Sequence, residues 1–172
     1  IGLFIHALVT LPLLLFLITR RNPFRHYRGM PSALVTAFST CSSIVTLPLT
    51  MKAVTDNSGV SKKIASFVLP IGATVNMDGT ALYECVAVVF IAQVYGIEVG
   101  VTQLVIVVIT ATLASIGAAG VPGIGFITLA IVLEALGIPL EGLAMVLGVE
   151  RILDMTRTAV NVTGDSAAAV WV

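Results

Sequence analysis

The sequence predicts an all-α polytopic membrane protein, and three features of the chain lead to this fold class. Of its 172 residues, 58% are hydrophobic and only 10% are charged, whereas charged residues make up about a quarter of a typical soluble domain. The apolar runs are about as long as a helix needs to be to cross a bilayer. Several of these runs are interrupted near their centres by glycine or hydrogen-bonding residues, which predicts helices that break inside the membrane.

The overall charge and the cysteines narrow the possible functions. The formal net charge is zero, which argues against nucleic acid as a partner. Cys41 and Cys85 form no disulfide or metal-binding spacing, so we expect two free thiols. The chain opens and ends inside apolar runs, and we expect it to be a piece of a longer polytopic protein.

Residues 1–29 are predicted to form a transmembrane helix followed by a basic cytoplasmic loop. The apolar run 3–19 has about the minimum length for a spanning helix, and Pro12 is expected to kink it. His6 has no partner visible in the sequence, so we expect a packed or interfacial histidine rather than a ligand. The arginines of segment 20–28 place this loop in the cytoplasm, because cytoplasmic loops carry an excess of Lys and Arg.

Residues 30–61 are predicted to form a first re-entrant hairpin on the cytoplasmic side. Both flanks of the apolar run 30–51 are basic, so both should lie inside and the run cannot simply cross. Its centre, Ser39 to Ser43, is rich in hydroxyl groups, which compete with helical hydrogen bonding. We therefore expect an unwound tip that is covered by protein or by a water-filled cavity.

Residues 62–98 are predicted to form one transmembrane helix that is interrupted in the middle. The interruption is the motif Asn76-Met77-Asp78-Gly79-Thr80, and such residues inside a span indicate a broken helix with exposed carbonyl groups. Glu84 follows one turn later, with no Lys or Arg near it in the sequence. It is a candidate proton carrier, and a structural glutamate satisfied by a hydroxyl or the backbone is an equally open interpretation.

Residues 99–138 are predicted to form a second hairpin that enters from the opposite side. The loops 96–103 and 134–141 carry acidic residues but no Lys or Arg, so both belong outside. Four glycines and a proline lie in the segment 117–125 between them. These residues break a helix and allow both hinge motion and close approach of the backbone to a ligand.

Residues 139–172 are predicted to form a final transmembrane helix that binds substrate. At 3.6 residues per turn, five polar side chains fall on one face of this helix: Asp154, Arg157, Thr158, Asn161 and Asp165. A charged side chain at mid-membrane costs roughly 2.5–3.5 kcal/mol on insertion scales, so this face must line a wet cavity or a binding site. Glu150 and Arg151 precede this face, and we expect them to pair with each other or with Asp154.

The predicted elements form an inverted repeat. A re-entrant helical hairpin and an interrupted transmembrane helix occur twice, with entry from opposite sides. This arrangement is typical of secondary transporters, in which discontinuous elements meet near the midplane and hold substrate and ions.

Four motifs together resemble the C-terminal transport core of the glutamate/aspartate (excitatory amino acid) transporter family. They are the tip Ser39–Ser43, the motif Asn76–Thr80, the tip Gly117–Gly125 and the polar face from Asp154 to Asp165. The resemblance covers nearly the whole chain. It implies an elevator-type transport domain, with the second hairpin as the extracellular gate. It also implies a homotrimer that is built on an N-terminal scaffold portion of the same protein and lies, as a multi-pass protein, in the plasma membrane.

The resemblance further implies where an acidic amino acid binds. Its α-amino group is expected on Asp154, its α-carboxylate on Asn161 and on the tip residues Ser42 and Ser43, and its distal carboxylate on Arg157. The residues expected to complete the pocket are Thr80, Gly120, Val121 and Thr158.

Two to three sodium sites are implied in the same way. The first site would use carbonyls of Gly72, Asn76 and Asn161 with the carboxylate of Asp165. The second site would use carbonyls of Thr74, Ser115, Ile116 and Ala118. The third site would use Asn76 and Asp78 with residues outside this chain. Glu84 stands where animal members of the family have their proton carrier. Oxygen ligands of this kind suit hard cations.

The function predicted from these features is sodium-coupled uptake of L-glutamate or L-aspartate. Glu84 is the candidate for coupling this uptake to protons. No enzymatic reaction is expected. A sodium-dependent neutral amino acid or C4-dicarboxylate carrier of the same family is the main alternative. An intramembrane aspartyl protease would need two facing carboxylates that share a proton, whereas Asp154 has a cation one turn away. A channel-like or structural module remains a further alternative. The chain lacks the arginines that family members carry at the positions of Cys41 or Met155, which leaves potassium counter-transport open.

Overall fold

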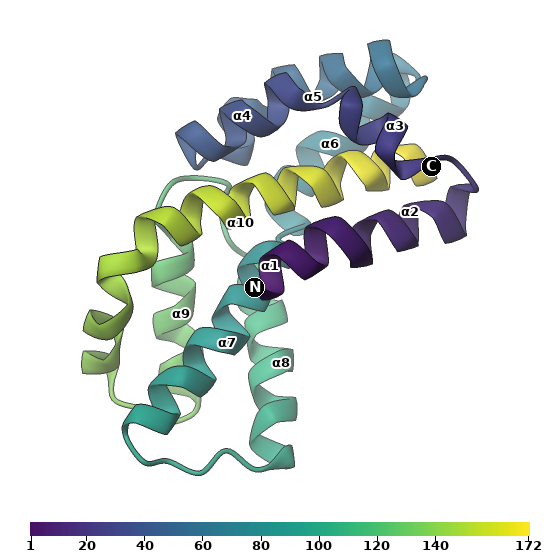
Figure 1. Cartoon of the computed structure of the whole chain (residues 1–172). Helices are drawn as coiled ribbons and strands as arrows, with labels where there is room; N and C mark the ends of the chain where they lie inside the picture. Colours follow the sequence, from purple (N-terminus) through teal and green to yellow (C-terminus); the bar gives the residue numbers. More distant parts are fainter.

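One long helix organises the molecule. The computed structural model describes residues 1–172 and contains only helices and their connections, which confirms the all-α prediction. Helix α10 (Leu143–Trp171) runs between an upper group of helices, α3 to α6, and a lower group, α7 to α9 (Figure 1). Its central residues therefore face elements from both groups.

The N-terminal helix changes pitch ahead of its proline. It consists of α1 (Gly2–Ile5), the π-helical segment η1 (His6–Thr10) and α2 (Leu11–Thr19). Pro12 cannot donate a backbone hydrogen bond and its ring crowds the preceding turn, so the wider turn of η1 takes the place of the predicted kink. Arg20 ends α2 in the left-handed conformation, with φ of +56°.

The predicted basic loop contains a short helix, α3 (Pro23–Arg28), which the Asn22 side chain caps. His26 fixes α3 to its neighbours, because its ring is hydrogen-bonded to Ser58 (2.8 Å) and to Ser166 (2.9 Å). These two serines lie near the ends of α5 and α10, so the loop is anchored to both helices.

Helices α4 (Pro31–Thr40) and α5 (Ser43–Ser58) pack side by side and are joined by a two-residue turn. Cys41 adopts the left-handed conformation (φ +54°), and the Ser42 hydroxyl accepts a hydrogen bond from the Val45 amide as the cap of α5. The helix break therefore lies inside the hydroxyl-rich segment at the centre of this run.

Helices α6 (Lys62–Val75) and α7 (Asp78–Val94) form the interrupted helix, with the break at Asn76 and Met77. By length and composition, two helical stretches could cross a membrane: Gly2–Thr19, and the 33 residues of Lys62–Val94 taken together.

Helices α8 (Val101–Ile116) and α9 (Ile124–Ala135) are shorter apolar helices separated by the irregular segment 117–123. Gly123 begins α9 in the left-handed conformation (φ +78°), which favours glycine. A short 3₁₀ turn, η2 (Leu140–Gly142), then leads into α10.

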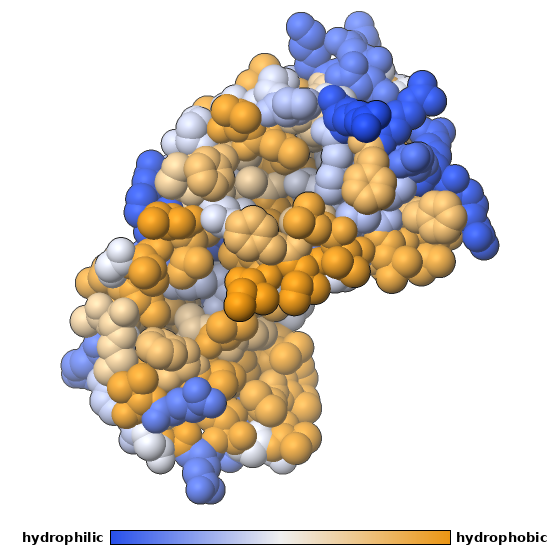
Figure 2. Space-filling view, in the orientation of Figure 1, coloured by the Kyte–Doolittle hydropathy of each residue, from blue (hydrophilic) through white to orange (hydrophobic).

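Two apolar cores lie on either side of α10. The lower core joins α7, α8 and α9 around residues such as Val88, Leu129 and Leu133. The upper core joins α4, α5 and α6 to the second half of α10, where Val162 and Ala169 contribute. Many large apolar side chains stay exposed, and orange atoms cover much of the visible face (Figure 2). Such extensive apolar surface suits contact with lipid or with another protein segment.

Candidate functional site

The polar face of α10 is buried at the meeting point of the two helix groups. Asp154, Arg157, Thr158, Asn161 and Asp165 are each at most 6% exposed. A single helix supplies all five because their spacing places them on one face. The five side chains therefore form one buried polar strip.

Arg157 is the centre of a charged cluster. Its Nη2 atom donates to Glu150 Oε1 at 2.5 Å and to Asp154 Oδ1 at 3.0 Å. The Tyr83 ring lies beneath the guanidinium, with 4.4 Å between Cζ and the ring centroid, and the Tyr83 hydroxyl donates to Glu150. Its Nη1 atom is buried without a hydrogen-bond partner. This Nη1 atom thus keeps hydrogen-bonding capacity that no protein group uses.

The expected pairing of Glu150 and Arg151 is wrong. Glu150 pairs with Arg157, two helical turns later on the same face, while Arg151 points away and is exposed without an ion pair. The interval of seven residues was a usable signal, because two full turns return a side chain to nearly the same direction.

The two predicted hairpin tips meet beside this cluster. The Ser42 hydroxyl, at the tip between α4 and α5, donates to the Gly120 carbonyl at 2.6 Å. The Ser43 hydroxyl donates to the Ala73 carbonyl at 2.8 Å. Asp154 Oδ2 accepts a hydrogen bond from the Gly123 amide at 3.0 Å. Segments about 80 residues apart in the chain therefore close over α10 together.

Asn161 connects α10 to the broken helix. Its Oδ1 atom accepts from the amides of Gly79 (2.7 Å) and Thr80 (3.3 Å), and its Nδ2 atom donates to the Thr80 hydroxyl (3.0 Å). Asn161 thus satisfies amides at the start of α7 that have no partner within the helix. A Cβ atom at Gly79 would lie 2.8 Å from the Arg157 carbonyl, so only glycine allows this close approach.

The residues predicted for the first sodium site lie together. The carboxylate of Asp165 lies against Gly72, where a Cβ atom would overlap it, and its Oδ1 atom is buried without a hydrogen-bond partner. The Asn76 side chain donates to the Asn161 carbonyl at 3.5 Å. A buried carboxylate oxygen without a donor is costly unless a cation or a proton reaches it, so this set fits a cation that binds oxygen.

Asp78 has a partner that the sequence did not reveal. His6 Nε2 lies 2.6 Å from Asp78 Oδ2, while Asp78 Oδ1 is buried without a partner. No partner for His6 was visible in the sequence because Asp78 lies 72 residues later in the chain, at the break between α6 and α7. The contact agrees with the expectation of a packed histidine. The Oδ1 atom of Asp78 therefore has no protein partner that would compete with the predicted cation.

The residues predicted for the second sodium site come from α6 and α8, whose helices contact each other. Ser115 and Ala118 are buried, Thr74 is half-buried, and Ile116 is exposed. The Ser115 carbonyl accepts a hydrogen bond from the Ala118 amide at 3.1 Å. No residue of this set contributes a carboxylate, so any cation here would depend on backbone carbonyl groups.

Two other predicted residues differ in their surroundings. Val121 is 42% exposed, whereas its neighbour Gly120 is buried at the contact with Ser42. Glu84 is fully buried on α7, and neither of its carboxylate oxygens has a hydrogen-bond partner. The Thr128 side chain interacts with Glu84, so the proton carrier and the structural glutamate both stay predictions.

Comparison with known proteins gives the context of this site. The model of the sodium:dicarboxylate symporter family matches residues 1–172, the whole chain. The chain belongs to this family.

The similar proteins in this family include transporters named for neutral amino acids and transporters named for excitatory amino acids. Over 169 residues, or 98% of the chain, it is 52% identical to "Neutral amino acid transporter A" of Bos taurus and 51% identical to "Excitatory amino acid transporter 1" of Homo sapiens. It is 53% identical over 165 residues, 96% of the chain, to "Excitatory amino acid transporter 3" of Homo sapiens. The chain spans about a third of the length of these relatives (32%, 31% and 32%).

The relatives are named as transporters, and none of the three names an enzyme. This agrees with the expectation that the symporter chain is not an enzyme.

Proposed function

We propose that the whole protein is a secondary active transporter that couples the uptake of L-glutamate or L-aspartate to sodium. The observation that carries this proposal is the buried guanidinium of Arg157 with its unpartnered Nη1 atom. A planar guanidinium matches a carboxylate in bidentate fashion, which makes it suited to the distal carboxylate of an acidic amino acid.

The neighbouring residues would hold the rest of the substrate. Asp154 would accept the α-amino group, and Asn161 with Ser42 and Ser43 would bind the α-carboxylate. In the structure these groups bind one another and the two tips, through the Ser42–Gly120 and Asp154–Gly123 hydrogen bonds. Substrate would exchange those bonds for its own, so binding and movement of the tips would be coupled. Gly120, Val121, Thr80 and Thr158 would line the remaining pocket.

Sodium would be the co-transported ion, at two to three sites. The unpartnered oxygens of Asp165 and Asp78 support sites there, because each needs a positive charge in a buried environment. Carbonyls of Gly72, Asn76 and Asn161 would complete the first. Those of Thr74, Ser115, Ile116 and Ala118 would form the second, and the Asn76–Asp78 site would need residues outside this chain.

Glu84 would carry a proton. A fully buried carboxyl group has a smaller desolvation penalty when it is neutral. Loading and release of a proton at Glu84 would then accompany the transport cycle.

The chain would act as the moving part of an elevator mechanism. Residues 30–61 and 99–138 would be re-entrant hairpins, the second serving as the extracellular gate. The N-terminal portion of the full protein would supply the scaffold and the contacts of a homotrimer in the plasma membrane. The buried junction of both tips with α10 supports a unit that moves as one body.

A neutral amino acid or C4-dicarboxylate carrier is the alternative. The name of a relative that is 52% identical, "Neutral amino acid transporter A", favours the neutral carrier. Arg157 favours the acidic substrate, because a neutral side chain would leave the guanidinium Nη1 unsatisfied.

The experiment is uptake of radiolabelled aspartate by the full-length protein in proteoliposomes, with and without an inward sodium gradient. We expect saturable uptake that requires the gradient and that unlabelled glutamate, but not serine, competes away. Asp165→Asn should sharply raise the sodium concentration that gives half-maximal aspartate binding. Uptake that does not depend on the sodium gradient, or stronger competition by serine than by glutamate, would overturn the proposal.

A further inference from the structure

The molecule has one strongly basic end. Of its nine Lys and Arg residues, seven lie between positions 20 and 63, where Asp56 is the single acidic residue; the seven are Arg20, Arg21, Arg25, Arg28, Lys52, Lys62 and Lys63. None of them forms an ion pair, since the ion pairs of the chain involve only His6 and Arg157 as cations. Figure 2 shows hydrophilic side chains gathered at this end, over α3 and the neighbouring ends of α5 and α6.

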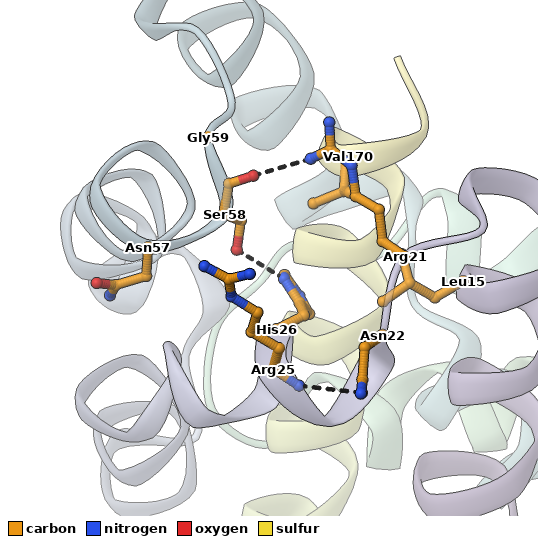
Figure 3. A pocket seen from close by; sticks show the side chains of 9 residues that line it. All are labelled: Leu15, Arg21, Asn22, Arg25, His26, Asn57, Ser58, Gly59 and Val170. Atoms are coloured by element: carbon orange, nitrogen blue, oxygen red, sulfur yellow. Dashed lines mark hydrogen bonds between the residues drawn. The ribbon is translucent and has the colours of Figure 1, made fainter.

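A cavity of about 430 Å³ opens in the basic end, between α3 and the last turn of α5. Two arginines, Arg21 and Arg25, contribute to its wall together with uncharged polar groups of Asn22, Asn57 and Ser58, and no carboxylate lines it. Arg21 Nη1 donates to the Ser58 carbonyl at 3.0 Å, which holds one guanidinium in place. The Arg25 guanidinium makes no hydrogen bond, and Figure 3 shows it extending beside His26 toward Ser58.

His26 lines the same cavity as a neutral group. Burial lowers the pKa of His26 from 6.5 to about 4. The Ser166 hydroxyl donates to the Thr163 carbonyl, so it accepts from His26 Nε2, which leaves Nδ1 to accept from the Ser58 hydroxyl. The positive charge in the cavity therefore comes from the two arginines at any physiological pH.

An apolar groove of about 560 Å³ adjoins the cavity along α2. Its walls include Leu8, Leu13 and Phe16, each between 45% and 60% exposed, and Phe24 from α3. Asn22 lines both the groove and the basic cavity, so the two adjoin each other at this residue. A ligand that fits both compartments has an anionic group joined to a long apolar chain.

We propose that this end of the molecule binds one anionic phospholipid, with the phosphate between Arg21 and Arg25 and an acyl chain along the exposed face of α2. Anionic lipids are concentrated in the cytoplasmic leaflet, and basic pockets between spanning helices are places where their headgroups bind. An excess of basic residues alone would orient the protein in the membrane without needing a cavity. A basic cavity that adjoins an apolar groove favours a specific lipid site over diffuse attraction.

The test is native mass spectrometry of the full-length protein in detergent, titrated with phosphatidylglycerol or phosphatidylcholine. We expect one tightly bound phosphatidylglycerol and no comparable binding of phosphatidylcholine. The double variant Arg21→Gln/Arg25→Gln should weaken phosphatidylglycerol binding about 25-fold, because each basic residue near anionic lipid contributes about fivefold in affinity. The matched control is Lys62→Gln/Lys63→Gln, which removes the same charge from the same end outside the cavity.

Further arms separate the sources of the anion. Phe16→Ser should weaken the binding of phosphatidylglycerol while leaving the weak binding of inorganic phosphate unchanged. Arg25→Gln alone provides a second variant, since the Arg25 side chain makes no hydrogen bond that folding could require. The proposal is overturned if inorganic phosphate displaces the lipid at equal concentration, if the lysine control weakens binding as much as the arginine variant, or if the wild-type protein does not prefer phosphatidylglycerol.

Discussion

Arg157 shows how a costly buried charge is made tolerable and useful. It is 1% exposed and has two carboxylates and one aromatic ring as neighbours. Removing one partner of a buried charge is strongly destabilising, since the other charge stays uncompensated. An acidic substrate that pairs with Nη1 would add a third anion, so one of the two carboxylates must loosen when substrate arrives.

Replacing Arg157 should therefore change which substrate is carried. In Arg157→Cys, a dicarboxylate would bring an unpaired charge into the pocket, whereas serine or alanine would not. We expect loss of aspartate transport, with binding weakened about ten- to a hundredfold, the value of one charged hydrogen bond. Sodium-dependent serine uptake should appear in its place. Competition between serine and aspartate in proteoliposomes measures the change.

Arg151→Cys is the control for this exchange. Arg151 lies on the same helix, but it is exposed and forms no ion pair. The preference for aspartate should persist in this variant. If Arg157→Cys folds and keeps the preference while Arg151→Cys loses it, Arg151 binds the distal carboxylate instead.

His26 should make stability depend on pH. Its pKa is lowered from 6.5 to about 4 by burial, so the unfolded chain takes up a proton as the pH falls below about 6.5 before the folded chain does. The contribution of His26 to the free energy of unfolding is therefore nearly constant above about pH 6.5. It falls between about pH 6.5 and pH 4, by about 2 kcal/mol at pH 5.

Thermal unfolding of the full-length protein at pH 5 and pH 7.5 would measure this loss, and His26→Gln should remove the His26 part of it. The same acid sensitivity in wild type and variant would mean that other groups cause it. Ser58 and Ser166 remain in the variant, so its side chain can keep one of the two hydrogen bonds.

The sequence identified single residues well where helical periodicity determines the answer. The burial of the face from Asp154 to Asp165 followed from spacing alone. The His6–Asp78 contact did not, because it joins residues 72 positions apart and depends on how two helices pack. Tyr83 beneath Arg157 was missed for the same reason.

At the scale of elements, the interruptions in the helices place free backbone groups in the middle of the molecule. The breaks at residues 41–42, 76–77 and 117–123 all leave backbone groups without helical partners. Some of those groups meet beside α10. Asn161 and Asp154 of α10 accept from the amides of Gly79 and Gly123, and Ser42 of the first tip donates to the Gly120 carbonyl. The broken helices thus provide the contacts that close over α10 and the backbone groups that we propose bind the ligand.

Gly120 should be essential for the contact between the two tips. A Cβ atom there would lie 2.6 Å from the Ala73 carbonyl and would collide with the Ser43 hydroxyl. Gly120→Ala therefore forces the tips apart and removes the Ser42–Gly120 hydrogen bond. Tips that are held apart would lose about one of the hydrogen bonds that they are proposed to make to the substrate, so we expect the KM for aspartate to rise about tenfold.

Gly117→Ala is the matched control in the same segment, because its Cβ atom would meet only backbone oxygens at 3.8 Å. Uptake by this variant should have a KM close to that of the wild type. Equal KM values for the two alanine variants would show that the tip contact does not contribute to binding.

The positions of the helix breaks could be predicted because glycine, asparagine and hydroxyl residues act locally on the backbone. The π-helical turn ahead of Pro12 could not, since a proline kink and a pitch change satisfy the same local constraint. The short helix α3 was also missed within the basic loop, where its cap Asn22 followed by Pro23 was a usable signal.

At the scale of the whole molecule, charge is distributed unevenly between the two ends. The basic residues between positions 20 and 63 gather at one end. The loops 96–103 and 134–141 carry only acidic charge, and they join the opposite ends of the lower helices (Figure 1). By the positive-inside rule, this asymmetry predicts that the basic end lies in the cytoplasm.

Thiol labelling of the full-length protein would test this orientation. Asp56 is exposed at the basic end, and Glu141 is exposed in the acidic loop that precedes α10. In membrane vesicles, a reagent that cannot cross the bilayer should label Asp56→Cys only from the cytoplasmic side and Glu141→Cys only from the outside. Cys41 is buried and Cys85 is partly buried, so the wild-type protein gives the background. If both variants are labelled from one side, the two hairpins cannot enter from opposite sides, and the inverted repeat proposed for this chain is wrong.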